Sequence, residues 1–211
     1  MDSLPPVYEL YAIRYAERDA RRSDHFIGGD PHDGPMPMDY FVWAAIGRER
    51  SFVIDTGFTA EVAAARGRRH LRCPFLARSF EVEDVVGIVR LNFARRVKLY
   101  NGPAELAPGI SLHPVGGHTP GMQFVRVHTS RGWVVLASDV THYYENMETG
   151  RPFTAAFHIG EMLEAYDALR AHASSPQHII PGHDPLVTRR YPPPKPELEG
   201  IVVRLDVAPR D

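Results

Sequence analysis

The order of the predicted elements indicates an α+β protein in which helices cover β-sheets. Some segments have alternating or short continuous apolar runs, as in strands, and others repeat apolar residues every three to four positions, as in helices. Strands come first, followed by a helix, more strands, a second helix and a last strand. Grouped strands with separate helices are typical of layered α+β folds.

The first half of the chain predicts an extended segment, a loop, a hairpin and a helix. Residues 7–16 have mixed alternation, and residues 17–38 are rich in Asp, Gly and Pro, which indicates a long loop. Apolar runs on either side of 47–50 predict a hairpin whose second strand ends at Ile54. The alanine-rich residues 59–69 predict a helix.

The second half predicts two amphipathic helices among several strands. Valines recur at i, i+3, i+4 and i+7 within residues 81–95, and residues 160–173 have an apolar side and an acidic first turn. The remaining segments are expected to be strands at 97–100, 110–115, 122–128, 132–138, 177–180 and 201–206, with a polyproline-like arm at 191–200.

Composition excludes several classes of function. The chain has 211 residues and a formal net charge of −2, which gives no electrostatic basis for binding nucleic acid or an anionic membrane. Apolar runs are far shorter than the ~20 residues that span a bilayer. The N-terminus has no secretory pattern, and the single cysteine, Cys73, cannot form an intrachain disulfide. We therefore expect a cytoplasmic protein without nucleic-acid or membrane partners.

Three segments place a histidine or aspartate just after an apolar strand, among small residues. They contain His118 in GGHTPG, Asp139 after LAS, and His183 in PGHDP. Two imidazoles and a carboxylate that converge would suit zinc, iron or manganese. Each residue alone is more often a turn former or a helix cap, so the prediction depends on the combination.

These segments resemble the metallo-β-lactamase superfamily, and the chain is most similar to its N-acyl homoserine lactonase group. The resemblance rests on Asp55–Gly57, on residues 116–121, 138–139 and 181–185, and on the loop 28–43. It implies an αβ/βα four-layer sandwich in one domain over 1–211. It also implies a hydrolase that opens a lactone, or a related ester, by attack of a metal-bound hydroxide.

One part of the family pattern is missing. The family carries a His-x-His-x-Asp-His motif after its first helix, whereas only His70 lies between Asp55 and His118 here. The first half of the sandwich is therefore expected to be incomplete, with an apparent internal deletion near 73–80. Either the protein or its gene model has lost a segment, or the sequence given is not the whole natural chain.

The resemblance implies roles for the residues that remain. His118, Asp139 and His183 match metal ligands, and we expect one zinc ion rather than two, with iron or manganese as alternatives. A tyrosine three residues after the family's bridging aspartate assists lactone opening, and His142 stands at that place here, next to Tyr143. Asp139 and either His142 or Tyr143 are thus candidate catalytic residues. An exposed pair of loop residues is the competing interpretation of His142 and Tyr143.

Two further expectations follow from the resemblance. The loop that contains His25 and His32 would lie near the pocket, where Phe26, Met36, Met38 and Tyr40 would line an acyl-chain channel; solvent-exposed polar residues are the alternative for the two histidines. Loss of a neighbouring strand would expose Val53 and Ile54, unless a partner subunit in a homodimer covers that edge.

The sequence leaves two functions open. One is a metal-dependent hydrolase acting on a small lactone or ester. The other is a degenerate, non-catalytic family member that binds at most one metal ion or a small ligand.

Overall fold

The computed structural model describes residues 4–55 and 82–210. The chain divides into two compact units, residues 1–56 with 102–211, and residues 57–101. The expected single domain over 1–211 stays a prediction, and the expected helix at 59–69 lies outside the described residues. In the second unit, α4 (Val82–Phe93) agrees with the helix predicted at 81–95.

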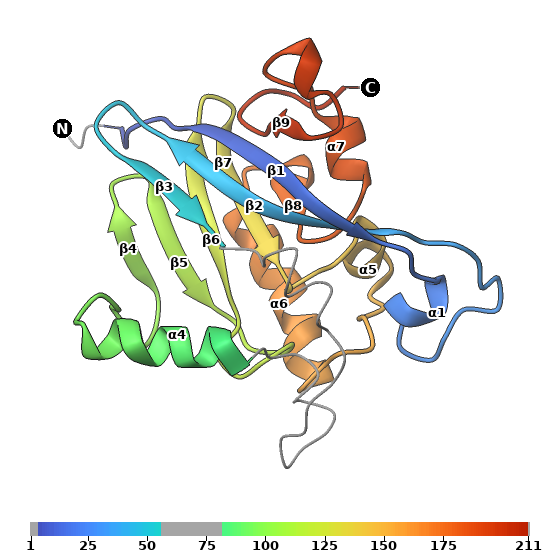
Figure 1. Ribbon diagram of the computed structural model, residues 1–211. Helices are drawn as coiled ribbons and strands as arrows, with labels where there is room; N and C mark the ends of the chain where they lie inside the picture. Colours follow the sequence, from blue (N-terminus) through green and yellow to red (C-terminus); the bar gives the residue numbers. More distant parts are fainter. Residues whose placement is uncertain (1–3, 56–81, 211) are drawn as a thin grey trace. The chain divides into compact units, whose positions relative to one another are not determined.

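The first unit contains a four-stranded antiparallel sheet (Figure 1). Its strands, in spatial order, are β3 (Ser51–Ile54), β2 (Met38–Ile46), β1 (Glu9–Arg18) and β9 (Val202–Arg204). Every second residue of β2 from Phe41 to Ala45 is buried, so one face of this strand packs on the core. These side chains form one side of the core.

The second sheet of this unit has five strands. In spatial order they are β4 (Ala104–Ala107), β5 (Ile110–Pro114), β6 (Gln123–Thr129), β7 (Gly132–Ser138) and β8 (Ile179–Pro181). Only β7 and β8 are paired in parallel among these neighbours. Their carboxyl ends therefore lie side by side at one edge of the sheet.

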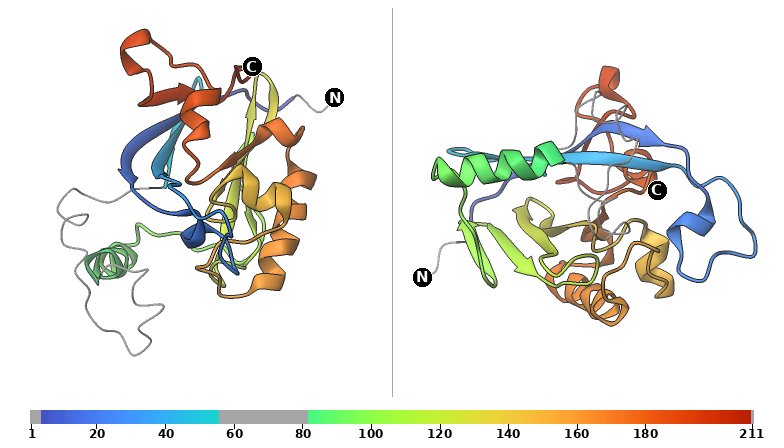
Figure 2. Two further views of the ribbon diagram at one scale, coloured as in Figure 1. Left: turned by 90° about the vertical axis from the view of Figure 1, so that its right-hand side faces the viewer. Right: turned by 60° about the horizontal axis from the view of Figure 1, so that its bottom comes forward.

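The two sheets and a helix form layers, which confirms the predicted α+β class. The sheets face each other, and α6 (Ile159–His172) lies on the far side of the five-stranded sheet (Figure 2). Residues from both sheets, including Leu10, Trp43 and Val134, share one buried core. The order of strands and helices in the sequence therefore predicted the layering correctly.

Some local predictions are wrong. Residues 97–100 form no strand; β4 lies further along the chain. The expected loop at 17–38 contains α1 (Arg22–His25). Short helical segments that the periodicity missed are α5 (Tyr144–Thr149), η1 (Pro176–His178), α7 (Leu186–Arg190) and η2 (Pro196–Leu198). Helices this short are held by tertiary contacts and caps, which a periodicity argument cannot detect.

Strand β3 lies at the edge of its sheet. Val53 is 74% exposed, as expected, whereas Ile54 is only partly exposed and packs against the core. Among the described residues, no helix has both the length and the apolar character that crossing a membrane requires.

A histidine pair lies where α6 meets the five-stranded sheet. The ring of His113 stacks on Phe124 and lies 4.2 Å, centroid to centroid, from the ring of His172. Burial, together with the charges of His172 and Arg126, lowers the pKa of His113 to about 4. The folded protein therefore favours the neutral form of this side chain.

This depressed pKa predicts that the free energy of unfolding falls as the pH drops from about 6.5 to about 4. In that window the unfolded chain binds a proton that the folded chain does not. His113→Gln is expected to lose less stability than the wild type between these pH values, measured by urea unfolding. His128→Gln, on the same sheet, is the control. Equal losses in wild type and His113→Gln would contradict the prediction.

Candidate metal centre

The parallel strands β7 and β8 bring Asp139 and His183 together. Past the ends of these strands, Gly182 N and His183 N donate hydrogen bonds to the carbonyls of Thr141 and His142 at 3.0 Å. A Cβ added to Gly182 would lie 2.5 Å from Ser138 O, so only glycine allows the two segments to approach this closely. The close contact with Ser138 therefore explains why glycine precedes His183.

A different loop supplies His118. Gly116 and Gly117 adopt positive φ values, 73° and 95°, and approach Glu161 and Met162 in the first turn of α6. There the Glu161 carboxylate accepts a hydrogen bond from Gly117 N at 3.1 Å. His118 Nδ1 contacts Ala155 O at 2.5 Å, which aims the opposite ring nitrogen towards Asp139.

Three imidazoles surround the Asp139 carboxylate. His183 Nε2 lies 2.7 Å and His142 Nε2 3.3 Å from Asp139 Oδ1, and His118 Nε2 lies 3.7 Å from Asp139 Oδ2. One donor atom from each of Asp139, His142 and His183 lies within 4.8 Å of the others. The structure thus brings together His118, Asp139 and His183, and adds His142.

The ring nitrogens of two histidines are oriented for a metal ion. Nδ1 of His118 and Nδ1 of His183 each donate to a backbone carbonyl, of Ala155 and Asp39 respectively. Such outer hydrogen bonds are typical of metal-ligating histidines, because they leave Nε2 free to bind. His142 Nδ1 is buried and has no hydrogen-bond partner among the described residues. The donor atoms of Asp139, His142 and His183 lie close enough together for one divalent ion such as zinc, iron or manganese, and His118 Nε2 lies beside the other carboxylate oxygen.

The electrostatics of the cluster favour the ionised form of the Asp139 carboxyl group. Burial alone would raise the pKa of Asp139, but the charge of His183 and hydrogen bonds from His142 and His183 outweigh it and hold this pKa well below its usual value. Burial disfavours a charged His183, yet Asp139 raises its pKa overall. Burial lowers the pKa of His142 to about 3. His142 is therefore a neutral imidazole, the form that binds metals.

Aromatic rings line two sides of the cluster. Phe153 stacks on His142 at 3.4 Å between centroids and also contacts His118. Tyr40 packs edge-on against His183 at 5.0 Å. The side chain of Asp139 keeps 34% of its surface exposed, so the cluster remains open to solvent on that side.

Tyr143 and the loop histidines lie elsewhere. Tyr143 is 2% exposed, and its hydroxyl donates to Pro37 O and contacts His25 Nε2, both at 3.0 Å. The solvent-exposed interpretation is wrong for His25, which is 1% exposed, and right for His32. Phe26 and Met38 are also buried, with exposures of 0% and 5%.

The sequence did not show which groups support the cluster. His142 was a candidate acid or carbonyl-polarising group, not a neighbour of the two other imidazoles. The carbonyls of Asp39 and Ala155 orient two of those imidazoles. Because every residue has a backbone carbonyl, a sequence motif cannot indicate this role. Only the three-residue spacing between Asp139 and His142 could have indicated that His142 lies in the cluster.

Comparisons with known proteins place the fold. No family model matches the chain. An N-acyl homoserine lactonase from Bacillus sp. is 34% identical over 89 residues, which covers 41% of this chain and 35% of the relative. The crystal structure of a quorum-quenching N-acyl homoserine lactone lactonase matches with a TM-score of 0.64 and 20% identity, over 87% of this chain and 94% of that one.

The chain has the metallo-β-lactamase fold of these lactonases. An N-acyl homoserine lactone hydrolase with N-hexanoyl-L-homoserine at its catalytic metal centre has the same TM-score of 0.64, at 20% identity, and covers 85% of this chain and 94% of its own. A probable metal-dependent hydrolase from Staphylococcus aureus matches with a TM-score of 0.60 at 9% identity, over 99% and 97% of the two chains. The resemblance in sequence to the lactonase group is confirmed over the matched segment, and at these low identities the structural matches establish the fold alone.

Proposed function

We propose that this chain is a metal-dependent hydrolase that opens a small lactone or ester. The observation that carries the proposal is the convergence of His118, Asp139, His142 and His183 from three separate segments of the sheet edge. The shared fold with N-acyl homoserine lactonases and the 34% identical segment support the substrate class.

His118, Asp139, His142 and His183 would hold one metal ion, with zinc as the first candidate. A bound zinc ion would act as a Lewis acid and lower the pKa of a water molecule towards ~7. The chain itself supplies two imidazoles, of His118 and His183, whose Nδ1 atoms are already bound to carbonyls, so little reorganisation is needed. The open side of Asp139 gives a substrate carbonyl access to the cluster.

The charge of Asp139 and the neighbouring aromatic rings would have further roles. Asp139 stays ionised and can hold a proton donor in place beside a reacting carbonyl. Phe153 and Tyr40 exclude water from the flanks of the imidazoles and fix their planes. Since the hydroxyl of Tyr143 is engaged by Pro37 and His25, we do not assign it a role at the reacting atoms.

Metal removal tests the proposal. Treatment with a chelator should abolish lactone hydrolysis, and return of about one equivalent of zinc should restore it, because Asp139, His142 and His183 form one metal-sized group of donor atoms. Elemental analysis after dialysis measures the stoichiometry, and acid release from an N-acyl homoserine lactone measures the activity. Two tightly bound equivalents, or full activity after chelation, would contradict the proposal.

A second candidate is a non-catalytic protein that binds one metal ion. It is favoured by the missing His-x-His-x-Asp-His motif, which supplies further ligands in the family. Acid release distinguishes the hydrolase from the non-catalytic metal-binding protein. A protein that binds one equivalent of zinc but releases no acid from lactones or aryl esters fits the second.

A further inference from the structure

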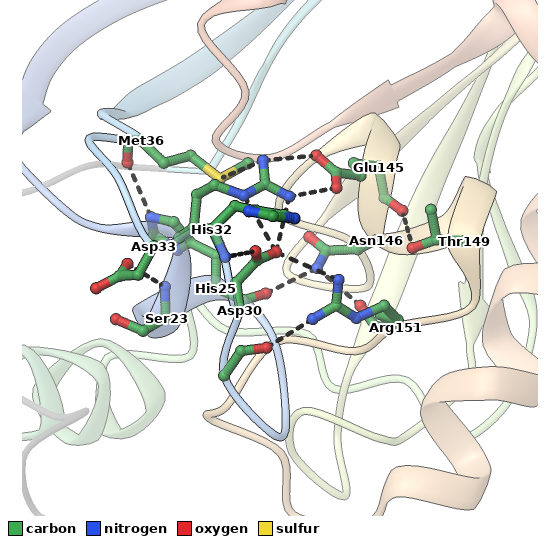
Figure 3. A network of polar contacts seen from close by, with 12 residues as sticks. Ser23, His25, Asp30, His32, Asp33, Met36, Glu145, Asn146, Thr149 and Arg151 are labelled. Carbon is green, nitrogen blue, oxygen red and sulfur yellow. Dashed lines mark hydrogen bonds and ion pairs between the residues drawn. The ribbon is translucent and has the colours of Figure 1, made fainter.

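A network of ion pairs joins the loop between β1 and β2 to α5 and to Arg151, just after this helix (Figure 3). The side chain of Asp30 is only 6% exposed, and it binds two guanidinium groups: Arg22 at 3.0 Å and Arg151 at 3.4 Å. Arg22 also forms a two-point contact with Glu145 of α5, and Arg151 donates to Gly29 O at 2.6 Å. A buried carboxylate between two arginines is expected to hold both arginine side chains in one arrangement.

The same network contacts an apolar ring and a buried amide. Both guanidiniums lie over Phe26, at 4.9 Å and 4.5 Å from the ring centre. Asn146, which is fully buried, donates to the carbonyls of His25 and Arg151 at 2.9 Å. The loop and α5 are thus joined by several contacts, and Arg151 takes part both in the ion pair with Asp30 and in the hydrogen bond with Asn146.

Residues 151–155 connect this network to the candidate metal centre. On the loop side, Pro152 O accepts from Ile27 N at 2.9 Å, and the Thr154 hydroxyl donates to Asp24 O at 2.8 Å. On the opposite side, the Phe153 ring stacks on His142, and Ala155 O accepts from His118 Nδ1. One five-residue segment therefore contacts the loop and two of the imidazoles.

We propose that Asp30 is a positioning residue for the metal centre: through Arg151 and residues 151–155, it sets the orientation of His118 and His142. This inference rests on the proposed function, because it assigns the role to a centre that binds metal. Loss of the Asp30 charge would remove the ion pair with Arg151 and weaken the hold on the segment that contacts both rings. Asp30 does not touch the cluster itself, so it acts only through these contacts.

The test compares two carboxylates of the same loop. Asp30→Asn is expected to weaken cobalt(II) affinity about tenfold, the lower end of the effect of outer partners of metal ligands, and to change the visible absorption of the bound cobalt. Asp33→Asn is the matched control. Asp33 also pairs with an arginine, Arg21, and accepts a backbone N–H, but its side chain is 31% exposed and forms no hydrogen bond or ion pair with residues 151–155.

Chelator competition gives the affinities, and far-ultraviolet circular dichroism verifies that each variant is folded. Weaker cobalt binding and an altered spectrum in Asp30→Asn alone support the proposal. Equal affinities and spectra in wild type, Asp30→Asn and Asp33→Asn overturn it. A wild type that binds no cobalt overturns the proposed function, and this inference with it.

A second variant covers the case in which Asp30→Asn does not fold. Thr154→Val has nearly the same shape, is exposed, and removes only the hydrogen bond to Asp24 O. It should change the cobalt spectrum and weaken binding by a smaller factor than Asp30→Asn. An unchanged spectrum and affinity in folded Thr154→Val would then count against a role of this segment in orienting the rings.

Discussion

Asp139→Asn should abolish both metal binding and lactone hydrolysis. Asp139 is the only residue of the cluster that contacts all three imidazoles, and it supplies the only carboxylate among the four donors. An amide keeps the shape but loses the charge that balances a divalent ion. We expect metal affinity to fall by more than the roughly 10–100-fold that the loss of an outer partner costs.

Asp167→Asn provides the comparison for this variant. Asp167 is a carboxylate of α6 whose side chain is 83% exposed and pairs with Arg170, so its loss should leave metal binding and hydrolysis unchanged. Isothermal titration of zinc into the metal-free proteins and an acid-release assay measure the two quantities. Zinc affinity of Asp139→Asn within a few-fold of the wild type would show that the metal does not bind here.

Gly182→Ala should separate the two strand ends that hold Asp139 and His183. The added methyl group would lie 2.5 Å from Ser138 O and 2.7 Å from Ser138 C, and these are backbone atoms that cannot rotate away. Overpacking of this kind costs about 1–3 kcal/mol in the free energy of unfolding. Because His183 follows directly, its contact with Asp139 should lengthen and the metal affinity should fall.

Gly121→Ala is the control for the glycine variant. Gly121 belongs to the GGHTPG segment, is exposed, and an added Cβ would meet no atom within 4 Å. Thermal unfolding of the metal-free proteins and zinc titration separate the effect on packing from the effect on the site. Similar unfolding midpoints and affinities for the two variants would mean that β7 and β8 tolerate a wider separation.

The sequence predicted the parts of the fold that depend on local patterns. The apolar runs of β2 and β7 each correspond to a strand that packs on the core, and the acidic first turn of 160–173 marks the start of α6. It failed where tertiary contacts decide the structure. Residues 97–100 pair with no strand in the described part of the chain, and α5 forms where Asn146 caps it by accepting from Tyr143 N.

For the candidate site, the sequence by itself determined which chemical groups are available: His118, Asp139 and His183, each after an apolar strand and beside glycine or serine. Only the tertiary structure decided which groups meet. The parallel pairing of β7 with β8 brings Asp139 to His183, and the carbonyls of Ala155 and Asp39 aim two imidazoles at it. The physical reason is that strand pairing and backbone hydrogen bonds act between segments far apart in the chain, so residue type and spacing do not encode them individually.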